Sequence, residues 1–317
     1  MKFIIEDGVL VKYYGNESVI TLPYSVKVIG RRAFACAEGK EVILNEGCER
    51  IEKYAFSRMR GLKKVCFAKV KHIENHAFMM CDLEEVVIGE GTEIIEAEAF
   101  SYNKNLKKVL LPKSLKHIDS TAFLGCALEN LEISPENPCF ETENNVLFTK
   151  GKEKIIVYGM GKGETVYNIP AEVKEIAPYG FSECKNLEKV IFPEGFVKVG
   201  EFAFRNCDNL NNIVIPPSVK YLGDCAFRFC KSLTNIDFEG ETFDYFGAWL
   251  FDNCHALERV KLPKTEILDG TFCNCYKLKE VTFPETLKEI TWTAFLNCKD
   301  FTVSGLPQGC VIKERPK

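Results

Sequence analysis

Cysteine is the residue whose type and spacing could carry the most chemistry in this chain of 317 residues, which contains 15 cysteines. A column of cysteines could form a metal site, a ladder of disulfides or a row of buried free thiols. Eight of them stand three residues after a recurring phenylalanine: Cys81, Cys126, Cys184, Cys207, Cys230, Cys254, Cys275 and Cys298. Ala37, Met59 and Asn103 take this place in other repeats, which favours a position for small or soft buried groups. We therefore predict buried free thiols, with no metal and no cofactor.

The other residues that could support catalysis form no recognisable pattern. His72, Glu74 and His76 lack the spacing of a zinc protease helix. The glycine-rich stretch 159–163 precedes no predicted helix, so it is not expected to cradle a phosphate. Cys273 and Cys275 form a close pair, but no second pair follows at the spacing of a zinc ribbon. No catalytic, cofactor-binding or metal-binding residue is predicted, and an enzyme is the least favoured function.

The elements that position these residues repeat along the chain. A phenylalanine, usually preceded by alanine, recurs about every 23 residues, which is the signature of a solenoid. Its positions are Phe34, Phe56, Phe78, Phe100, Phe123, Phe181, Phe204, Phe227, Phe251, Phe272 and Phe295. The longer gap before Phe181 corresponds to one repeat plus an insert of about 35 residues.

One unit, residues 187–207, shows how a single repeat is expected to fold. Val190 should point into the core and Ile191 outward, because side chains alternate along a strand. Phe204 and Cys207 are three residues apart, which suits one turn of α-helix or 3-10 helix. A lone unit cannot bury its apolar face, so successive units should stack with each repeat phenylalanine on the next.

The predicted fold is therefore an α/β repeat solenoid of about 11 coils, wound right-handed, with short parallel strands and short helical or 3-10 turns. Asp7-Gly8 and Asn144-Asn145 tolerate positive φ, so each should form the turn of a β-hairpin. The first hairpin should cap the N-terminal edge, and the second should stand out beside the sheet. These hairpins divide one continuous solenoid into blocks 1–134 and 135–317, with a C-terminal cap from Thr302.

The unit resembles the BspA-like leucine-rich repeat family, whose repeat reads roughly L-x-x-V-x-I-P-x-x-V-x-x-I-G-x-x-A-F-x-x-C. The likeness recurs eleven times and covers nearly the whole chain. It implies that the solenoid is curved, a right-handed leucine-rich-repeat horseshoe with a concave parallel sheet. It also implies a surface or secreted binding module. The N-terminus departs from that implication, because Glu6 and Asp7 interrupt the apolar run of a signal peptide. We expect a cytoplasmic location for the sequence as given, or a surface or secreted one if a leader was trimmed.

Outward positions on the predicted strands supply the candidate binding residues. Apolar side chains hold the central outward position in six coils: Ile43, Cys66, Val87, Leu110, Ile191 and Val214. An exposed apolar stripe of this kind is typical of an interaction site, although β-propensity alone also favours such residues. A second candidate patch holds aromatic residues two positions before the repeat phenylalanine: Tyr54, Tyr179, Phe202 and Trp249. Aromatic anchors are typical of interfaces, but partial burial explains them equally well.

Net charge and the length of the apolar runs limit the classes of partner that the chain could bind. A net charge of -4 argues against nucleic acid, and no apolar run approaches the ~18 residues of a membrane span. The sequence therefore predicts a non-catalytic scaffold that binds an unknown protein or glycan through its concave face. The alternative is a self-associating surface protein, with homo-oligomers formed through a sheet edge, a hairpin or the same stripe. The unit containing Trp249 has irregular spacing, which predicts a local bulge.

Overall fold

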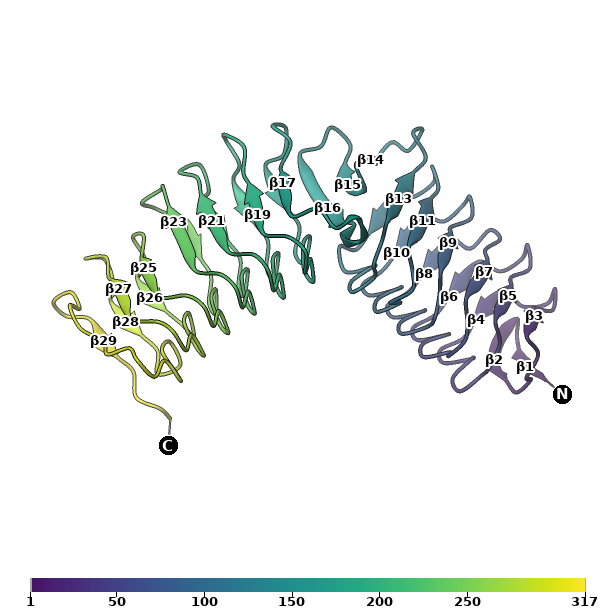
Figure 1. Ribbon diagram of the computed structural model, residues 1–317. Coiled ribbons are helices and arrows are strands. Elements are labelled where there is room, and N and C mark those ends of the chain that lie inside the picture. Colours follow the sequence, from purple (N-terminus) through teal and green to yellow (C-terminus); the bar gives the residue numbers. More distant parts are fainter. Residues whose placement is uncertain (1, 317) are drawn as a thin grey trace. The chain divides into compact units, whose positions relative to one another are not determined.

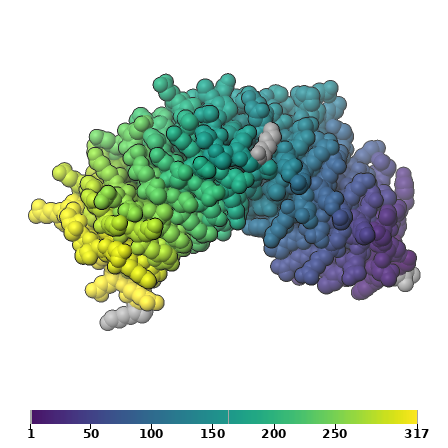
Figure 2. All heavy atoms as spheres, viewed as in Figure 1, coloured from purple at the N-terminus to yellow at the C-terminus, as the bar shows by residue number. Residues whose placement is uncertain are grey.

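The computed structural model describes residues 2–316, which fold into two compact units (Figure 1). The first unit comprises the residues up to 151 together with 156–162, and the second comprises 152–155 and the residues from 163 onward. Within each unit, successive coils lie side by side and their side chains fill the space between the ribbons (Figure 2). Most coils contribute one strand to each of two parallel ladders, which we call the long-strand and the short-strand ladder.

The long-strand ladder contains the strands whose central residue is buried. In the first unit it consists of β3 (Val19–Thr21), β5 (Glu41–Ile43), β7 (Lys64–Cys66), β9 (Glu85–Val87), β11 (Lys108–Leu111) and β13 (Asn130–Ile133). In the second unit it consists of β17 (Val166–Asn168), β19 (Lys189–Ile191), β21 (Asn212–Ile215), β23 (Asn235–Phe238), β25 (Arg259–Lys261) and β27 (Glu280–Thr282). Val190 is buried and Ile191 is exposed, so the alternation predicted for this strand is confirmed.

The short-strand ladder consists mostly of two-residue strands in which the second residue is usually buried, such as Ile51 and Val199. It begins with β2 (Val9–Tyr13), β4 (Val28–Ile29), β6 (Arg50–Ile51), β8 (His72–Ile73), β10 (Ile94–Ile95) and β12 (His117–Ile118). It resumes with β16 (Lys154–Tyr158), β18 (Glu175–Ile176), β20 (Lys198–Val199), β22 (Tyr221–Leu222), β24 (Tyr245–Phe246), β26 (Ile267–Leu268), β28 (Glu289–Ile290) and β29 (Val311–Ile312). Two-residue strands give too short a pattern for alternation to reveal them, so the sequence analysis did not anticipate this second ladder.

The expected helical turns and the α/β class are wrong. Within residues 2–316 the helical content is one 3-10 turn, η1 (Met160–Lys162), so the fold is a β-solenoid. Phe202 and Asn206, on either side of Phe204, have φ angles of 54° and 60°. Left-handed residues interrupt a helix. The amide of Phe204 instead donates a hydrogen bond to the carbonyl of Ala226 in the next coil, 2.8 Å away.

The expected number of coils is also too low, because the solenoid has about 14 turns rather than 11. The additional turns lack the repeat phenylalanine by which the sequence was counted. One holds Tyr13, whose ring centroid lies 5.2 Å from that of Phe34. Another holds the buried Phe148, and the last contains β29. Other residues can therefore complete a turn where the repeat phenylalanine is missing.

A column of stacked phenylalanines forms the core, as the repeat predicts. The ring centroids of Phe34 and Phe56 are 4.4 Å apart, and those of Phe78 and Phe100 are 5.1 Å apart with planes only 4° from parallel. In the second unit, Phe204 stacks on Phe181 at 5.1 Å. Burial of such rings dominates the stability of a core, and stacking aligns each coil with the next.

The predicted cysteine column lies beside the phenylalanines and is buried, as expected. Its thiols also have a role that the sequence analysis missed. The Sγ of Cys207 donates to the carbonyl of Phe181, and that of Cys230 donates to the carbonyl of Phe204, both at 3.2 Å. Asn103 occupies the same position and donates to the carbonyl of Phe78 at 2.8 Å. The position therefore suits a small side chain that can satisfy a buried carbonyl of the preceding coil.

This burial predicts selective alkylation. Cys36 is exposed, whereas Cys81 and Cys126 are buried, and burial raises the pKa of each of those two thiols to about 12. Because the thiolate is the reactive form, iodoacetamide at pH 8 should label Cys36 in the native protein and the column cysteines only after denaturation. Peptide mass spectrometry over time measures both rates. Labelling of Cys126 as fast as Cys36 would contradict the buried column.

Both predicted hairpins form. β1 (Phe3–Glu6) pairs with β2 in antiparallel fashion through Asp7 and Gly8, and β14 (Phe140–Glu143) pairs with β15 (Val146–Thr149) through Asn144 and Asn145. All four turn residues have positive φ, as a two-residue hairpin requires. The β14–β15 hairpin belongs to the first unit.

The expectation that the second hairpin stands out beside the sheet is wrong. Its residues Val146, Leu147 and Phe148 are buried. The side chain of Asn145 accepts a hydrogen bond from the amide of Leu131 at 2.6 Å and donates one to the carbonyl of Leu128 at 2.8 Å. These bonds hold the hairpin against β13, so it packs into the stack instead of projecting from it.

The irregular repeat around Trp249 corresponds to an interruption of both ladders. β23 is not paired with β25, and β24 is not paired with β26. The phenylalanine stack nevertheless continues, with centroid distances of 5.8 Å from Phe227 to Phe251 and 5.7 Å from Phe251 to Phe272. The long-strand ladder has a similar break between β7 and β9 in the first unit.

Candidate interaction surface

The outward residues of the first unit lie in register on the long-strand ladder. Ile43 is paired with Cys66, and Val87 is paired with Leu110. Val87 is 48% exposed, and the other three are half-buried. The next outward residue is Glu132, which ends the apolar row. We call Ile43, Cys66, Val87 and Leu110 the apolar row.

Charged residues border the apolar row, and they neutralise one another. Lys64 and Glu41 form an ion pair of 3.1 Å between adjacent strands, and Lys108 and Glu85 form one of 2.7 Å. The Cys66 thiol, which donates to Glu41 at 3.2 Å, and the Lys64 ammonium hold the pKa of the Glu41 carboxyl below its usual range. The border is therefore polar but locally balanced in charge.

A groove opens within the apolar row where the ladder breaks between β7 and β9. Its volume is about 500 Å³, and Cys66, Phe67 and Val87 line it together with charged residues of the border. The ring of Phe67 turns toward the core, with its centroid 5.7 Å from that of Phe78. The break thus provides a depression between neighbouring coils in the middle of the row, which we call the first groove.

The two candidate residues of the second unit also line one groove. Ile191 and Val214 border a space of about 290 Å³ between β19 and β21. Beyond Val214 the outward residues become polar, because Asp237, Lys261 and Thr282 follow. These three residues line a further groove of about 580 Å³ at the break between β23 and β25. The apolar surface of the second unit is thus shorter than that of the first.

The structure does not gather the four aromatic candidates into one patch. Tyr179 and Phe202 stack with centroids 4.8 Å apart. Trp249, farther along the same unit, packs against Gly270, where an added Cβ would lie 2.3 Å from the indole ring. Tyr54 lies in the first unit and stacks on His76 at 4.8 Å. All four have positive φ and are half-buried, so their rings cover the left-handed turns.

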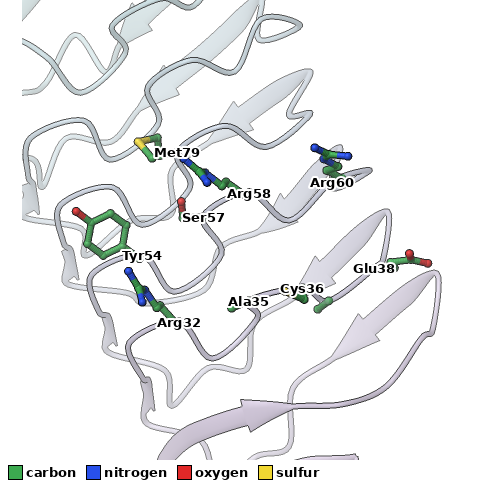
Figure 3. A pocket seen from close by; sticks show the side chains of 10 residues that line it. Arg32, Ala35, Cys36, Glu38, Tyr54, Ser57, Arg58, Arg60 and Met79 are labelled. Carbon is green, nitrogen blue, oxygen red and sulfur yellow. The ribbon is translucent and has the colours of Figure 1, made fainter.

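A pocket of about 680 Å³ lies on the turns of the first unit, beside Tyr54 (Figure 3). Its lining includes three arginines, Arg32, Arg58 and Arg60, and the exposed Cys36. The guanidinium of Arg32 lies 5.5 Å from the centre of the Tyr54 ring, a cation–π contact. The sequence analysis missed this pocket. The sequence did carry a signal, because five of the nine arginines fall between residues 31 and 60, and all of these except Arg50 lie within residues 31–32 or 58–60.

The other residues whose side chains could take part in chemistry make contacts of a structural kind. The Nε2 of His72 lies 2.6 Å from a carboxylate oxygen of Glu96, and the ring of His255 stacks on Tyr276. Among residues 2–316, no group of three or more His, Cys, Asp or Glu side chains is arranged to hold a metal ion. Over the same range, no helix has the length and apolar character to cross a membrane.

Comparisons with known proteins agree with this architecture. The model of the BspA type leucine-rich repeat region matches residues 12–84, 71–155 and 164–268. A search of curated proteins gave no match to the chain. A leucine-rich repeat protein from Eubacterium ventriosum is 26% identical, with a TM-score of 0.85, over 97% of this chain and 89% of its own.

Two other solved structures share the fold at lower identity. A leucine-rich cell surface protein from Faecalibacterium prausnitzii is 24% identical, with a TM-score of 0.62, over 95% of this chain and 91% of its own. The pneumococcal vaccine antigen PcpA is 21% identical, with a TM-score of 0.69, over 98% of this chain and 89% of its own. The stacked phenylalanines, the two ladders and the family model agree, and the chain belongs to the BspA-type leucine-rich repeat family.

Proposed function

We propose that the chain is a non-catalytic binding scaffold that recognises a protein partner through the apolar row of the first unit. Proteins of this repeat family are in general binding scaffolds. The observation that carries the proposal is the first groove, which opens within four consecutive outward apolar residues. Its apolar lining of Cys66, Phe67 and Val87 and its charged border match the arrangement of an interface with an apolar centre and a polar rim.

The chemistry of the row favours a protein over a glycan. Its exposed side chains are aliphatic or thiol, and the neighbouring Glu41 and Glu85 are already paired with lysines. A glycan rich in hydroxyl groups would need free hydrogen-bonding groups, which the ion pairs engage. A protein side chain inserted between Cys66 and Val87 would instead gain from the removal of apolar surface from water.

Val87→Asp should reduce capture of this partner from lysate or culture supernatant by roughly tenfold or more, because it places a charge at the centre of the contact. Ile267→Asp is the matched control, since Ile267 is 51% exposed on β26 and Val87 is 48% exposed on β9. Quantitative mass spectrometry of the retained proteins compares wild type with both variants. A protein lost with Val87→Asp and kept with Ile267→Asp supports the proposal.

Retention of the same proteins by all three forms would refute recognition through the apolar row. Thermal denaturation of each variant, followed by circular dichroism, separates a lost contact from a lost fold. Val87 lies on the surface of β9, so the substitution should change stability by no more than about 0.5 kcal/mol.

Self-association is the second candidate, and the edge of β29 favours it. β29 pairs with β28 on one side and ends its sheet, and its residues Val311 and Ile312 are 53% and 51% exposed. An exposed apolar strand edge can pair with another chain. Light scattering over a concentration series tests this function, and a constant monomer mass would exclude it.

A further inference from the structure

Several arginines of the chain are paired with carboxylates, whereas most of those in the coils of Phe34 and Phe56 are not. Arg228 contacts Asp252 at 2.7 Å, Arg259 contacts Glu280 at 3.3 Å, and Arg50 is paired with Glu74. Within residues 2–316, the guanidinium groups of four arginines that lie close in sequence have no carboxylate partner: Arg31, Arg32, Arg58 and Arg60. An excess of guanidinium groups therefore collects here on a chain whose net charge is negative.

The backbone of the coil that holds Phe34 also departs from the repeat at this place. In most later coils, the left-handed residues donate their amides to the next coil, as Tyr54 does to Asn75 and Arg58 does to Met79. The equivalent amides in the coil of Phe34, those of Arg32 and Cys36, have no such hydrogen bond within residues 2–316. Arg32 and Cys36 share the positive φ of Tyr54 and Arg58, and both line the pocket beside Tyr54.

The pocket of about 680 Å³ lies on these turns, between the coils of Phe34 and Phe56, with Met79 of the following coil in its lining. In Figure 3 the side chains of Arg32, Arg58 and Tyr54 lie around Ser57, while Arg60 and Glu38 lie toward the other end. The Tyr54 ring is already covered by Arg32 and His76, so it orients a guanidinium and offers no free face for a ligand. The pocket thus combines guanidinium groups, two unpaired backbone amides and the Ser57 hydroxyl.

We propose that this pocket binds a phosphate or sulfate ester of about the size of a monosaccharide. Guanidinium groups match the paired oxygens of such anions, and backbone amides bind the same oxygens in anion-binding turns. A volume of about 680 Å³ falls in the range of small-molecule sites, so the anion would be attached to a larger body rather than free. Glu38, the one carboxylate of the lining, lies where it would accept hydrogen bonds from hydroxyl groups of that body.

Isothermal titration calorimetry of the full chain tests the site. The probes are N-acetylglucosamine 6-sulfate, glucose 6-phosphate, inorganic sulfate and neutral N-acetylglucosamine. We expect saturable binding of at least one ester, weaker binding of the free anion, no binding of the neutral sugar, and lower affinity at higher salt.

The variant is Arg32→Asn with Arg58→Asn, and Arg259→Asn is the control in the second unit. Asparagine tolerates positive φ, and Asn206, Asn253, Asn274 and Asn297 already stand at the repeat position of Arg58. The double variant should therefore keep the fold and lose ester affinity by at least ~10-fold, whereas the control should bind like wild type.

Absence of saturable binding by both esters at millimolar concentration would overturn the inference, as would equal affinity of wild type and the double variant. Free sulfate binding as tightly as the sulfate ester would overturn the assignment of an ester. The apolar row lies on the strands and this pocket on the turns, so neither result bears on recognition of a protein partner.

Discussion

Phe204→Ala should lower the free energy of unfolding by ~3–5 kcal/mol. The ring of Phe204 is fully buried and stacks between Phe181 and Phe227, at centroid distances of 5.1 and 5.5 Å. Its removal leaves a cavity in the middle of the column, and rigid ladders on both sides prevent the neighbouring coils from closing it. The loss therefore includes both the transfer of the ring from the core and the cavity.

Tryptophan fluorescence during urea denaturation is the suitable measurement. Both tryptophans, Trp249 and Trp292, lie in the second unit with Phe204, so their signal reports the unit that carries the substitution. Ile267→Ala is the control, because Ile267 lies in the same unit, is 51% exposed and should cost no more than about 0.5 kcal/mol when truncated. A cost below ~1 kcal/mol for Phe204→Ala would mean that the column does not carry the stability of the unit.

Alkaline pH should destabilise the first unit through its buried thiols. Burial raises the pKa of Cys81 and of Cys126 from the usual 9.0 to about 12 in the folded chain. At pH values between 9 and 12, both thiols are mostly deprotonated in the unfolded chain and mostly protonated in the folded chain. The stabilisation is fully present below pH 9 and is lost as pH rises toward 12, by roughly 1.4 kcal/mol per pH unit for each thiol.

The variant Cys81→Ala with Cys126→Ala isolates this contribution from lysines and tyrosines that titrate in the same range. Free energies of unfolding are measured by urea denaturation with circular dichroism between pH 8.5 and 10.5, with a reductant present. The double variant should be less stable at pH 8.5, because two thiol contacts are lost, and over this range its stability should fall less steeply with pH by about 2 kcal/mol per pH unit on average. Equal slopes for the two proteins would refute the raised pKa values.

The two hairpin turns and the irregular repeat are features that local sequence can predict. Asp7-Gly8 and Asn144-Asn145 identify the turns, because positive φ at two successive positions is a local demand that few residue types meet. The altered spacing around Trp249 predicts a local bulge, and both ladders are interrupted there. The sequence does not show where the second hairpin packs, because the hydrogen bonds of Asn145 reach Leu128 and Leu131 in the preceding coil.

The turns show where local reasoning fails. Phe204 and Cys207 have helical spacing, yet the left-handed residues at 202 and 206 replace the helix with hydrogen bonds to the next coil. Phenylalanine at position 202 gives no sign of positive φ, which is uncommon for a bulky residue. The short-strand ladder is equally hidden, because each strand of two residues is defined only by the neighbours with which it pairs.

The candidate sites also combine features that the sequence predicts with features that only the structure shows. The sequence by itself determined the repeat, the buried phenylalanine and cysteine columns, and the outward positions of the apolar row, because each unit encodes its own pattern of burial and the pattern recurs. Only the tertiary structure decided where the ladders break to open the first groove, and where the amides of Arg32 and Cys36 lose their partners beside Arg58. Those features depend on how one coil meets the next, and contacts between residues about 23 positions apart leave no trace in the spacing of a single repeat.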